Sequence, residues 1–152
     1  MPITSKMPLA IALFLWAAAA AGQNQVLTPE APLPNRLGEL LDAGAKKLSA
    51  KDFRQELLTR TLYSSKGPRN TAILYAENGK VVGTSRSGGF TVENIDGSWA
   101  VGANETICST YRFGNVVFPQ RCVFWYKLGE MYFFSDSDSD RSASVERRTL
   151  RQ

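Results

Sequence analysis

The side chains that this sequence lacks restrict the reactions it could catalyse. The 152-residue chain has no histidine and two cysteines, so a Ser–His or Cys–His pair for nucleophilic catalysis cannot form. Carboxylates could still act as general acid and base, and the candidate pairs are Glu93 with Asp96 and Glu105 with Glu130. At such positions a carboxylate is more often a solvated turn residue. We therefore expect a protein that is not an enzyme, with a small hydrolase that uses carboxylates as the alternative.

Three aspartates at alternate positions, Asp136, Asp138 and Asp140, have the spacing of the oxygen ligands of Ca²⁺ in EF-hand loops. Such a loop also requires a glycine at its sixth position and a bidentate glutamate at its twelfth, where this chain has Arg141 and Arg147. We therefore interpret the segment as acidic and solvated. Neither a metal ion nor any other cofactor is predicted.

Aromatic side chains are the best indication of a binding role. In 124–126 and 132–134 three aromatic residues follow one another, so a strand there carries rings on both faces. One face must pack into the core, and the other needs a cover, which could be a helix, a ligand or a partner. The aromatic residues of this region are Phe90, Trp99, Tyr111, Phe118, Phe124, Trp125, Tyr126, Tyr132, Phe133 and Phe134.

The candidate site lies on one face of these two strands. We predict an exposed partner-binding face formed by Trp125, Tyr132 and Phe134, with Arg112 and Arg121 beside the hairpin that carries the cysteines. Tyr, Trp and Arg are the residue types that dominate binding hot spots. The alternative is that the helical segment described below covers this face.

The first 21 residues have the order of a secretory signal peptide. A basic start with Lys6 is followed by an apolar run over 9–18 and by small residues at 19–21. The apolar run is too short for a comfortable transmembrane helix, and no later stretch approaches the length needed to span a bilayer. We therefore expect a periplasmic or secreted protein with no integral membrane segment after cleavage.

The rest of the chain divides by composition into three parts. Residues 22–35 contain three prolines and are predicted to be a flexible tether. Residues 36–135 are predicted to form a single domain, and 136–152 a polar, loosely ordered tail. The formal net charge is +4, and no Lys/Arg cluster alternates with aromatic residues. These features argue against a nucleic-acid partner.

Cys108 and Cys122 are predicted to form a disulfide, because an exported protein with an even number of cysteines normally pairs them. If the two face each other across an antiparallel hairpin, the midpoint is Asn115, which lies in a plausible turn. A metal or redox pair is the weaker alternative, since no C-x-x-C spacing is present.

The segment 36–59 is predicted to be a bent or broken helical region. Apolar residues recur in its first part at three- and four-residue intervals, as one stripe of an amphipathic helix would. A second helix is expected to begin at Ser49, with Asp52 completing a capping box and with Leu48 and Phe53 in the positions of a hydrophobic staple.

From residue 61 onward the pattern is typical of strands. Asn78-Gly79 is the strongest short hairpin signal, and a two-residue turn there would place Tyr75 opposite Val82. Ile95-Asp96-Gly97 is predicted to be a further turn. The expected strands are 71–77, 80–84, 89–94, 98–101, 105–112, 120–128 and 131–135.

Together these elements predict an α+β domain. Its N-terminal helical segment packs on a six- or seven-stranded antiparallel meander, which is either a curled sheet or a small up-and-down barrel, with one disulfide.

Several short motifs resemble a family of small exported alphaproteobacterial proteins that is known only as a domain of unknown function. The likeness covers about residues 48–134 and implies an exported β-rich domain without implying an activity. The usual Leu-x-Gly-x-Thr after the first helix is missing, since the chain reads Leu57-Leu58-Thr59-Arg60-Thr61. The matching motifs are Leu48-Ser49-Ala50, Ala76–Gly83, Gly97-Ser98-Trp99-Ala100-Val101, Ile107-Cys108, Arg121-Cys122, Gly129 and Tyr132.

The function that these features favour is that of an exported, non-catalytic binding or interaction module. Its aromatic sheet face or barrel mouth would hold an unknown protein or a small apolar ligand. A second alternative is a periplasmic inhibitor of a protease or lysozyme, because such inhibitors are also small disulfide-bearing barrels. That likeness rests on fold alone.

Overall fold

The structure, a computed structural model, describes residues 32–88 and 91–150. The predicted signal peptide and most of the predicted tether lie outside the described residues. No helix in this part of the chain is long and apolar enough to cross a membrane. In chain order the elements are α1 (Leu37–Asp42), β1 (Lys46–Lys47), α2 (Ala50–Leu57), β2 (Thr61–Lys66), β3 (Arg69–Tyr75), β4 (Lys80–Ser87), β5 (Thr91–Val101), a 3-10 turn η1 (Ala103–Glu105), β6 (Ile107–Phe113), β7 (Val116–Leu128), β8 (Met131–Ser135) and β9 (Glu146–Leu150).

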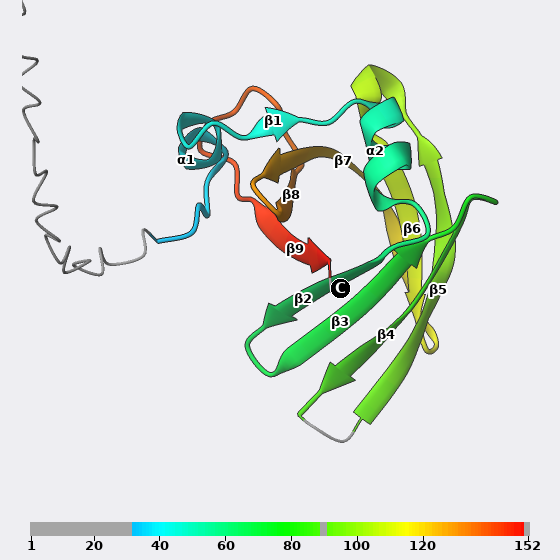
Figure 1. Ribbon diagram of the computed structural model, residues 1–152. Coiled ribbons are helices and arrows are strands. Elements are labelled where there is room, and N and C mark those ends of the chain that lie inside the picture. The colour runs from blue at the N-terminus through cyan, green and yellow to red at the C-terminus, as the bar shows by residue number, and fades with distance from the viewer. Residues whose placement is uncertain (1–31, 89–90, 151–152) are drawn as a thin grey trace, which may run out of the picture. The chain divides into compact units, whose positions relative to one another are not determined.

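Strands β2 to β9 form a closed antiparallel barrel of eight strands (Figure 1). Each strand pairs with the next one along the chain, and β9 pairs with β2 to close the circle. The short strand β1 pairs with the part of β7 that extends past β6. The predicted antiparallel meander is thereby confirmed. The fold is mostly β with two short helices, however, and the barrel has more strands than expected.

The segment that was expected to be a loosely ordered polar tail supplies the closing strand. β9 pairs with β8 on one side and with β2 on the other. Glu146 and Arg148 line the barrel interior, and Leu150 packs against the core. Charged residues at inward positions hide the apolar alternation by which a strand is normally recognised. The boundary of the domain at residue 135 was therefore wrong.

Strand β5 runs without interruption through residues that were predicted to form a turn. Ile95 is buried in the core and pairs with Gly83 on β4 and with Phe113 on β6. Gly97 permits a close approach of strands, because a Cβ atom at this position would lie 1.9 Å from the carbonyl oxygen of Thr110. This glycine marks a tight contact within one strand and not a reversal of the chain.

The hairpin at Asn78-Gly79 forms, but its register differs by one residue from the prediction. Tyr75 pairs with Val81 and not with Val82. The loop has one residue more than expected, and Gly79 closes it in the left-handed region with φ 79°. As a result Val81 is fully buried, whereas Val82 is 45% exposed.

The predicted break in the helical region is confirmed, and α2 closes one end of the barrel. The capping box forms as expected: the Ser49 hydroxyl accepts a hydrogen bond from the Asp52 amide, and the Asp52 carboxylate accepts one from the Ser49 amide. Phe53 inserts among the rings of Tyr75, Trp99 and Trp125, with centroid distances of 5.3 to 5.5 Å. This aromatic cluster fills the closed end of the barrel.

Helix α1 covers the outer side of the barrel at β7 and β8. Leu37 and Leu40 are buried there against Tyr126 and Phe133. The carbonyl groups of Arg141 and Ala143, in the connection between β8 and β9, accept hydrogen bonds from the first turn of α1. Both faces of the two aromatic strands are thus covered, the outer face by α1 and the inner face by the barrel interior.

The predicted disulfide between Cys108 and Cys122 is confirmed, and it joins directly opposite positions of β6 and β7. The two cysteines are 14 residues apart in the chain, so the bond is expected to contribute about 3 kcal/mol by restricting the unfolded chain. Replacing both cysteines with serine should lower the free energy of unfolding in urea by roughly that amount. Dithiothreitol should destabilise the wild type to a similar degree and leave the double variant unchanged. Equal stability of the two proteins under oxidising conditions would contradict this prediction.

Candidate functional site

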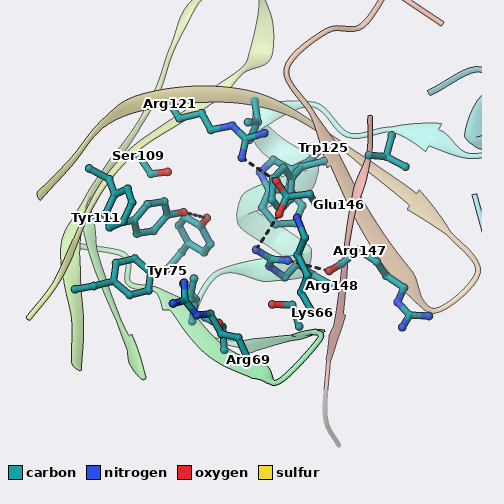
Figure 2. A pocket seen from close by; sticks show the side chains of 18 of the residues that line it. Lys66, Arg69, Tyr75, Ser109, Tyr111, Arg121, Trp125, Glu146, Arg147 and Arg148 are labelled. Atoms are coloured by element: carbon teal, nitrogen blue, oxygen red, sulfur yellow. Dashed lines mark hydrogen bonds and ion pairs between the residues drawn. The ribbon is translucent and has the colours of Figure 1, made fainter. Parts of the chain in front are cut away.

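A cavity of about 860 Å³ lies inside the barrel, and its lining residues come from β2, β3, β6, β7, β8 and β9. Figure 2 shows α2 behind it, at the closed end. The other end is bordered by the β2–β3 and β6–β7 turns and by the start of β9. A barrel of eight strands is wide enough either to be filled by its own side chains or to hold one small ligand. In this barrel the part next to α2 is filled, and the remainder is hollow.

Aromatic rings form the floor of the cavity. Trp125 lies between Tyr75 and Phe134, with ring-centroid distances of 6.2 Å and 5.2 Å. Nearer the open end, Phe113 and Phe118 make an edge-to-face contact at 5.2 Å. These residues all line the cavity, so its walls and floor present a large apolar surface to any occupant.

Two tyrosine hydroxyl groups meet above this floor. The hydroxyl oxygens of Tyr75 and Tyr111 are 2.6 Å apart, and either could be the donor. Burial of the Tyr75 ring, followed by the neighbouring Tyr111 hydroxyl, raises the pKa of Tyr75 well above its ordinary value. The Tyr75 hydroxyl group therefore stays protonated at neutral pH. Because one O–H is used within the pair, the other can be donated to a ligand.

One wall carries a network of charged groups. Arg121 on β7 donates two hydrogen bonds to Asp136, at 2.7 and 2.9 Å, and one to Glu146 at 3.0 Å. These contacts raise the pKa of Arg121, mainly through the hydrogen bond to Asp136. The network fixes Arg121 at the edge of the cavity and gives Glu146 a cationic partner.

Arg148 on β9 is the most deeply placed cation of the cavity, and its side chain is 15% exposed. Its Nη1 donates to the carbonyl group of Arg147 at 2.9 Å, and its Nη2 lies 3.9 Å from Glu146 Oε2. The guanidinium carbon lies 4.8 Å from the centroid of the Phe134 ring. Figure 2 shows Arg148 projecting into the same space as Tyr75 and Tyr111.

The open end combines basic and apolar residues. Lys66 and Arg69, which flank the β2–β3 turn, line the cavity. At the β6–β7 hairpin, Val116, Val117 and Phe118 are 58%, 71% and 44% exposed. Phe118 also lines the cavity, so the apolar surface of the interior continues onto the rim.

The structure brings together three of the five residues that were predicted to bind a partner. Trp125, Phe134 and Arg121 line the cavity. The hydroxyl group of Tyr132, which is also buried, donates to Glu56 on α2 at 2.9 Å. The three aromatic residues were predicted to be exposed, but they are buried, because their face turns toward the barrel interior. Their role in binding stays a prediction, now for an internal site.

Arg112 does not belong to this cavity. Its exposed guanidinium forms an ion pair with Asp96, and this pair lowers the pKa of the aspartate. Glu93, the predicted catalytic partner of Asp96, is three residues away on the same strand and therefore points to the opposite face. In the second candidate pair, Glu105 accepts a hydrogen bond from the Ala50 amide at the start of α2, and Glu130 lies in the β7–β8 turn.

The three alternate aspartates have separate partners. Asp136 pairs with Arg121, Asp138 forms an ion pair of 2.7 Å with Lys47, and Asp140 accepts hydrogen bonds from Ser142. Within residues 32–88 and 91–150, no group of acidic, histidine or cysteine side chains is arranged to hold a metal ion.

Sequence reasoning missed the polar part of the cavity, namely Tyr75, Tyr111, Glu146 and Arg148. Alternation within the predicted strands could have identified the two tyrosines, because each lies two residues from another inward-facing side chain, such as Ile73. No such signal existed for Glu146 and Arg148, since their segment has the composition of a solvated tail.

No family model, curated protein or solved structure matches this chain. The resemblance to the exported alphaproteobacterial family consequently stays a prediction.

Proposed function

We propose that this protein is an exported, non-catalytic binding module that holds a small, largely apolar molecule inside its barrel. The observation that carries the proposal is the cavity of about 860 Å³, which has an aromatic floor and polar groups on one wall. Ligand sites are typically concave spaces of roughly 300–1,000 Å³ with mostly apolar walls and a few oriented polar groups. This cavity has each of these properties.

The rim supports the same proposal. Contiguous exposed apolar side chains often mark a site of interaction. Val116, Val117 and Phe118 lie where a molecule would enter, and Phe118 continues into the cavity. They therefore offer an apolar path between the surface and the aromatic floor.

Export is part of the proposal and rests on two features. The N-terminal sequence has the order of a signal peptide, and a disulfide joins the two cysteines of the described chain. Disulfides persist mainly in oxidising compartments. An exported binding protein would meet its ligand in such an oxidising compartment.

The proposal can be tested with N-phenyl-1-naphthylamine, an uncharged apolar dye that fluoresces when it leaves water. We expect the wild-type protein to bind it with one saturable site. Thr71 lines the cavity, and Thr71→Phe should weaken binding by about tenfold or more by filling that space. Thr84→Phe adds the same ring at an exposed position of β4 and should leave the affinity unchanged.

Thermal unfolding of both variants would show that they remain folded. Absence of saturable binding to the wild type, or equal losses in the two variants, would count against a site inside the barrel.

A further inference from the structure

The polar wall of the cavity has the chemistry to recognise an anion. Basic side chains that line the cavity outnumber its carboxylates, since Glu146 is the acidic residue among those lining it in the described part of the chain. The basic residues are Lys66, Arg69, Arg121, Arg147 and Arg148. The low-dielectric walls of a cleft strengthen the electrostatic potential of the charges that line it, and this potential attracts ligands of opposite charge.

These cations are not equally available to a ligand. Asp136 and Glu146 already hold Arg121 in three hydrogen bonds of 2.7 to 3.0 Å. Figure 2 shows Arg147 extending away from the cavity. Arg148 differs from both, because it projects inward and its contact with Glu146, at 3.9 Å, is longer than a hydrogen bond.

The surroundings of Arg148 are unfavourable for a positive charge, because the guanidinium is largely removed from water. Burial lowers the pKa of this guanidinium below the ordinary arginine value, yet arginine remains cationic in proteins. Its cation–π contact with the Phe134 ring offsets part of the free energy of hydration that is lost on burial. A buried cation without a closely bonded carboxylate is otherwise destabilising, and a ligand carboxylate would supply the missing partner.

We infer that the ligand is an amphipathic monocarboxylate whose carboxylate binds Arg148. This inference rests on the proposed function and specifies its ligand class. The planar guanidinium fork matches the two carboxylate oxygens. The free O–H of the Tyr75–Tyr111 pair, which interacts electrostatically with Arg148, donates a further hydrogen bond. The apolar body of the ligand extends past Phe134 toward Phe113 and Phe118.

Two features of the structure set the orientation of this ligand. Arg148 lies deeper than Lys66 and Arg69, which line the cavity beside the turn at its open end. The apolar surface, in contrast, extends from the floor to Phe118 at the rim. The carboxylate therefore enters first, guided by Lys66 and Arg69 at the rim, and the apolar body remains nearer the open end, against Phe113 and Phe118.

Isothermal titration calorimetry with three C12 probes tests the inference. Dodecanoate should bind the wild type about tenfold or more tightly than 1-dodecanol, and dodecylamine should bind more weakly than either. Arg148→Gln should reduce the affinity for dodecanoate by about tenfold and leave that for dodecanol unchanged. A purely structural role of Arg148 would instead lower both affinities together.

Two further variants keep the test decisive. Arg86→Gln makes the same change of charge at an exposed position of β4 that does not line the cavity, and it should alter dodecanoate binding by less than about twofold. The double variant Tyr75→Phe, Tyr111→Phe removes both hydroxyl groups of the pair with little change of shape, and it provides the test if Arg148→Gln fails to fold. It should weaken dodecanoate binding by about three- to tenfold and spare dodecanol.

The outcomes separate this inference from the proposed function. If the dye and dodecanol bind in the cavity but dodecanoate binds no more tightly than dodecanol, the proposed ligand class is wrong and the proposed binding module stands. If neither the dye nor any C12 probe binds, both fail. Equal losses of dodecanoate and dodecanol affinity in Arg148→Gln would also overturn the assigned role of Arg148.

Discussion

Replacing Phe53 with alanine is expected to lower the free energy of unfolding by about 3–5 kcal/mol. Its ring is almost completely buried and lies within 5.5 Å, centroid to centroid, of Tyr75, Trp99 and Trp125. Truncation would remove the contact by which α2 closes the barrel and would leave an apolar void among rigid rings. Rings held by different strands cannot collapse easily into that void, so the full cost should be observed.

Urea denaturation followed by far-UV circular dichroism would measure this change. Gln55→Ala is the matched control, because Gln55 is an exposed residue of the same helix and its loss should change stability by less than about 0.5 kcal/mol. A Phe53→Ala protein as stable as the wild type would show that α2 does not hold the end of the barrel closed.

The parts of the fold that could be predicted are those in which local chemistry and packing agree. Ser49 and Asp52 satisfy the first amides of α2 by themselves, so the start of that helix is visible in the sequence. The pairing of Cys108 with Cys122 likewise follows from a short hairpin and an even cysteine count.

The hairpin at Asn78-Gly79 shows where local chemistry is insufficient. Asn-Gly suits both a two-residue turn and a three-residue loop that ends in a left-handed glycine. The choice between them is made by the core, which accepts Val81 and leaves Val82 exposed. Packing of distant residues therefore decided the register, and no pattern within the hairpin contains that information.

The strand that closes the barrel was missed because it places charged side chains at inward positions. A strand beside a filled core alternates apolar and polar residues, whereas β9 places Glu146 and Arg148 toward a polar part of the interior. Glu146 and Arg148, which make part of the cavity polar, are thus the residues that interrupt the apolar alternation of the strand. Failures of sequence patterns are expected at functional sites, where local rules are broken in favour of recognition.

The aromatic strands were interpreted correctly in one respect and wrongly in another. Their two aromatic faces do need two covers, as predicted. The face of Trp125 and Phe134, however, turns into the barrel and not toward solvent. Alternation alone could separate the faces, but it could not tell which was internal until the barrel was known to close.

Trp125→Ala is expected to have an effect as large as that of Phe53→Ala, about 3–5 kcal/mol. Its side chain is 2% exposed and contacts Phe53, Tyr75 and Phe134. Trp125→Phe keeps a ring in the floor and removes an indole N–H that has no hydrogen-bond partner among the described residues. Its cost should therefore stay below about 1.5 kcal/mol.

Trp125 belongs to both the core and the floor of the cavity, so its replacement tests stability and the proposed binding together. Trp125→Ala should weaken binding of N-phenyl-1-naphthylamine as well as lower the melting temperature, whereas Trp125→Phe should change both much less. The double variant with Phe53→Ala should cost less than the sum of the single changes, since the two neighbouring voids merge and the coupling between such contacts is about 0.5–3 kcal/mol. Strict additivity would mean that the two rings do not share one cluster. Full dye affinity in a destabilised Trp125→Ala protein would remove Trp125 from the binding site.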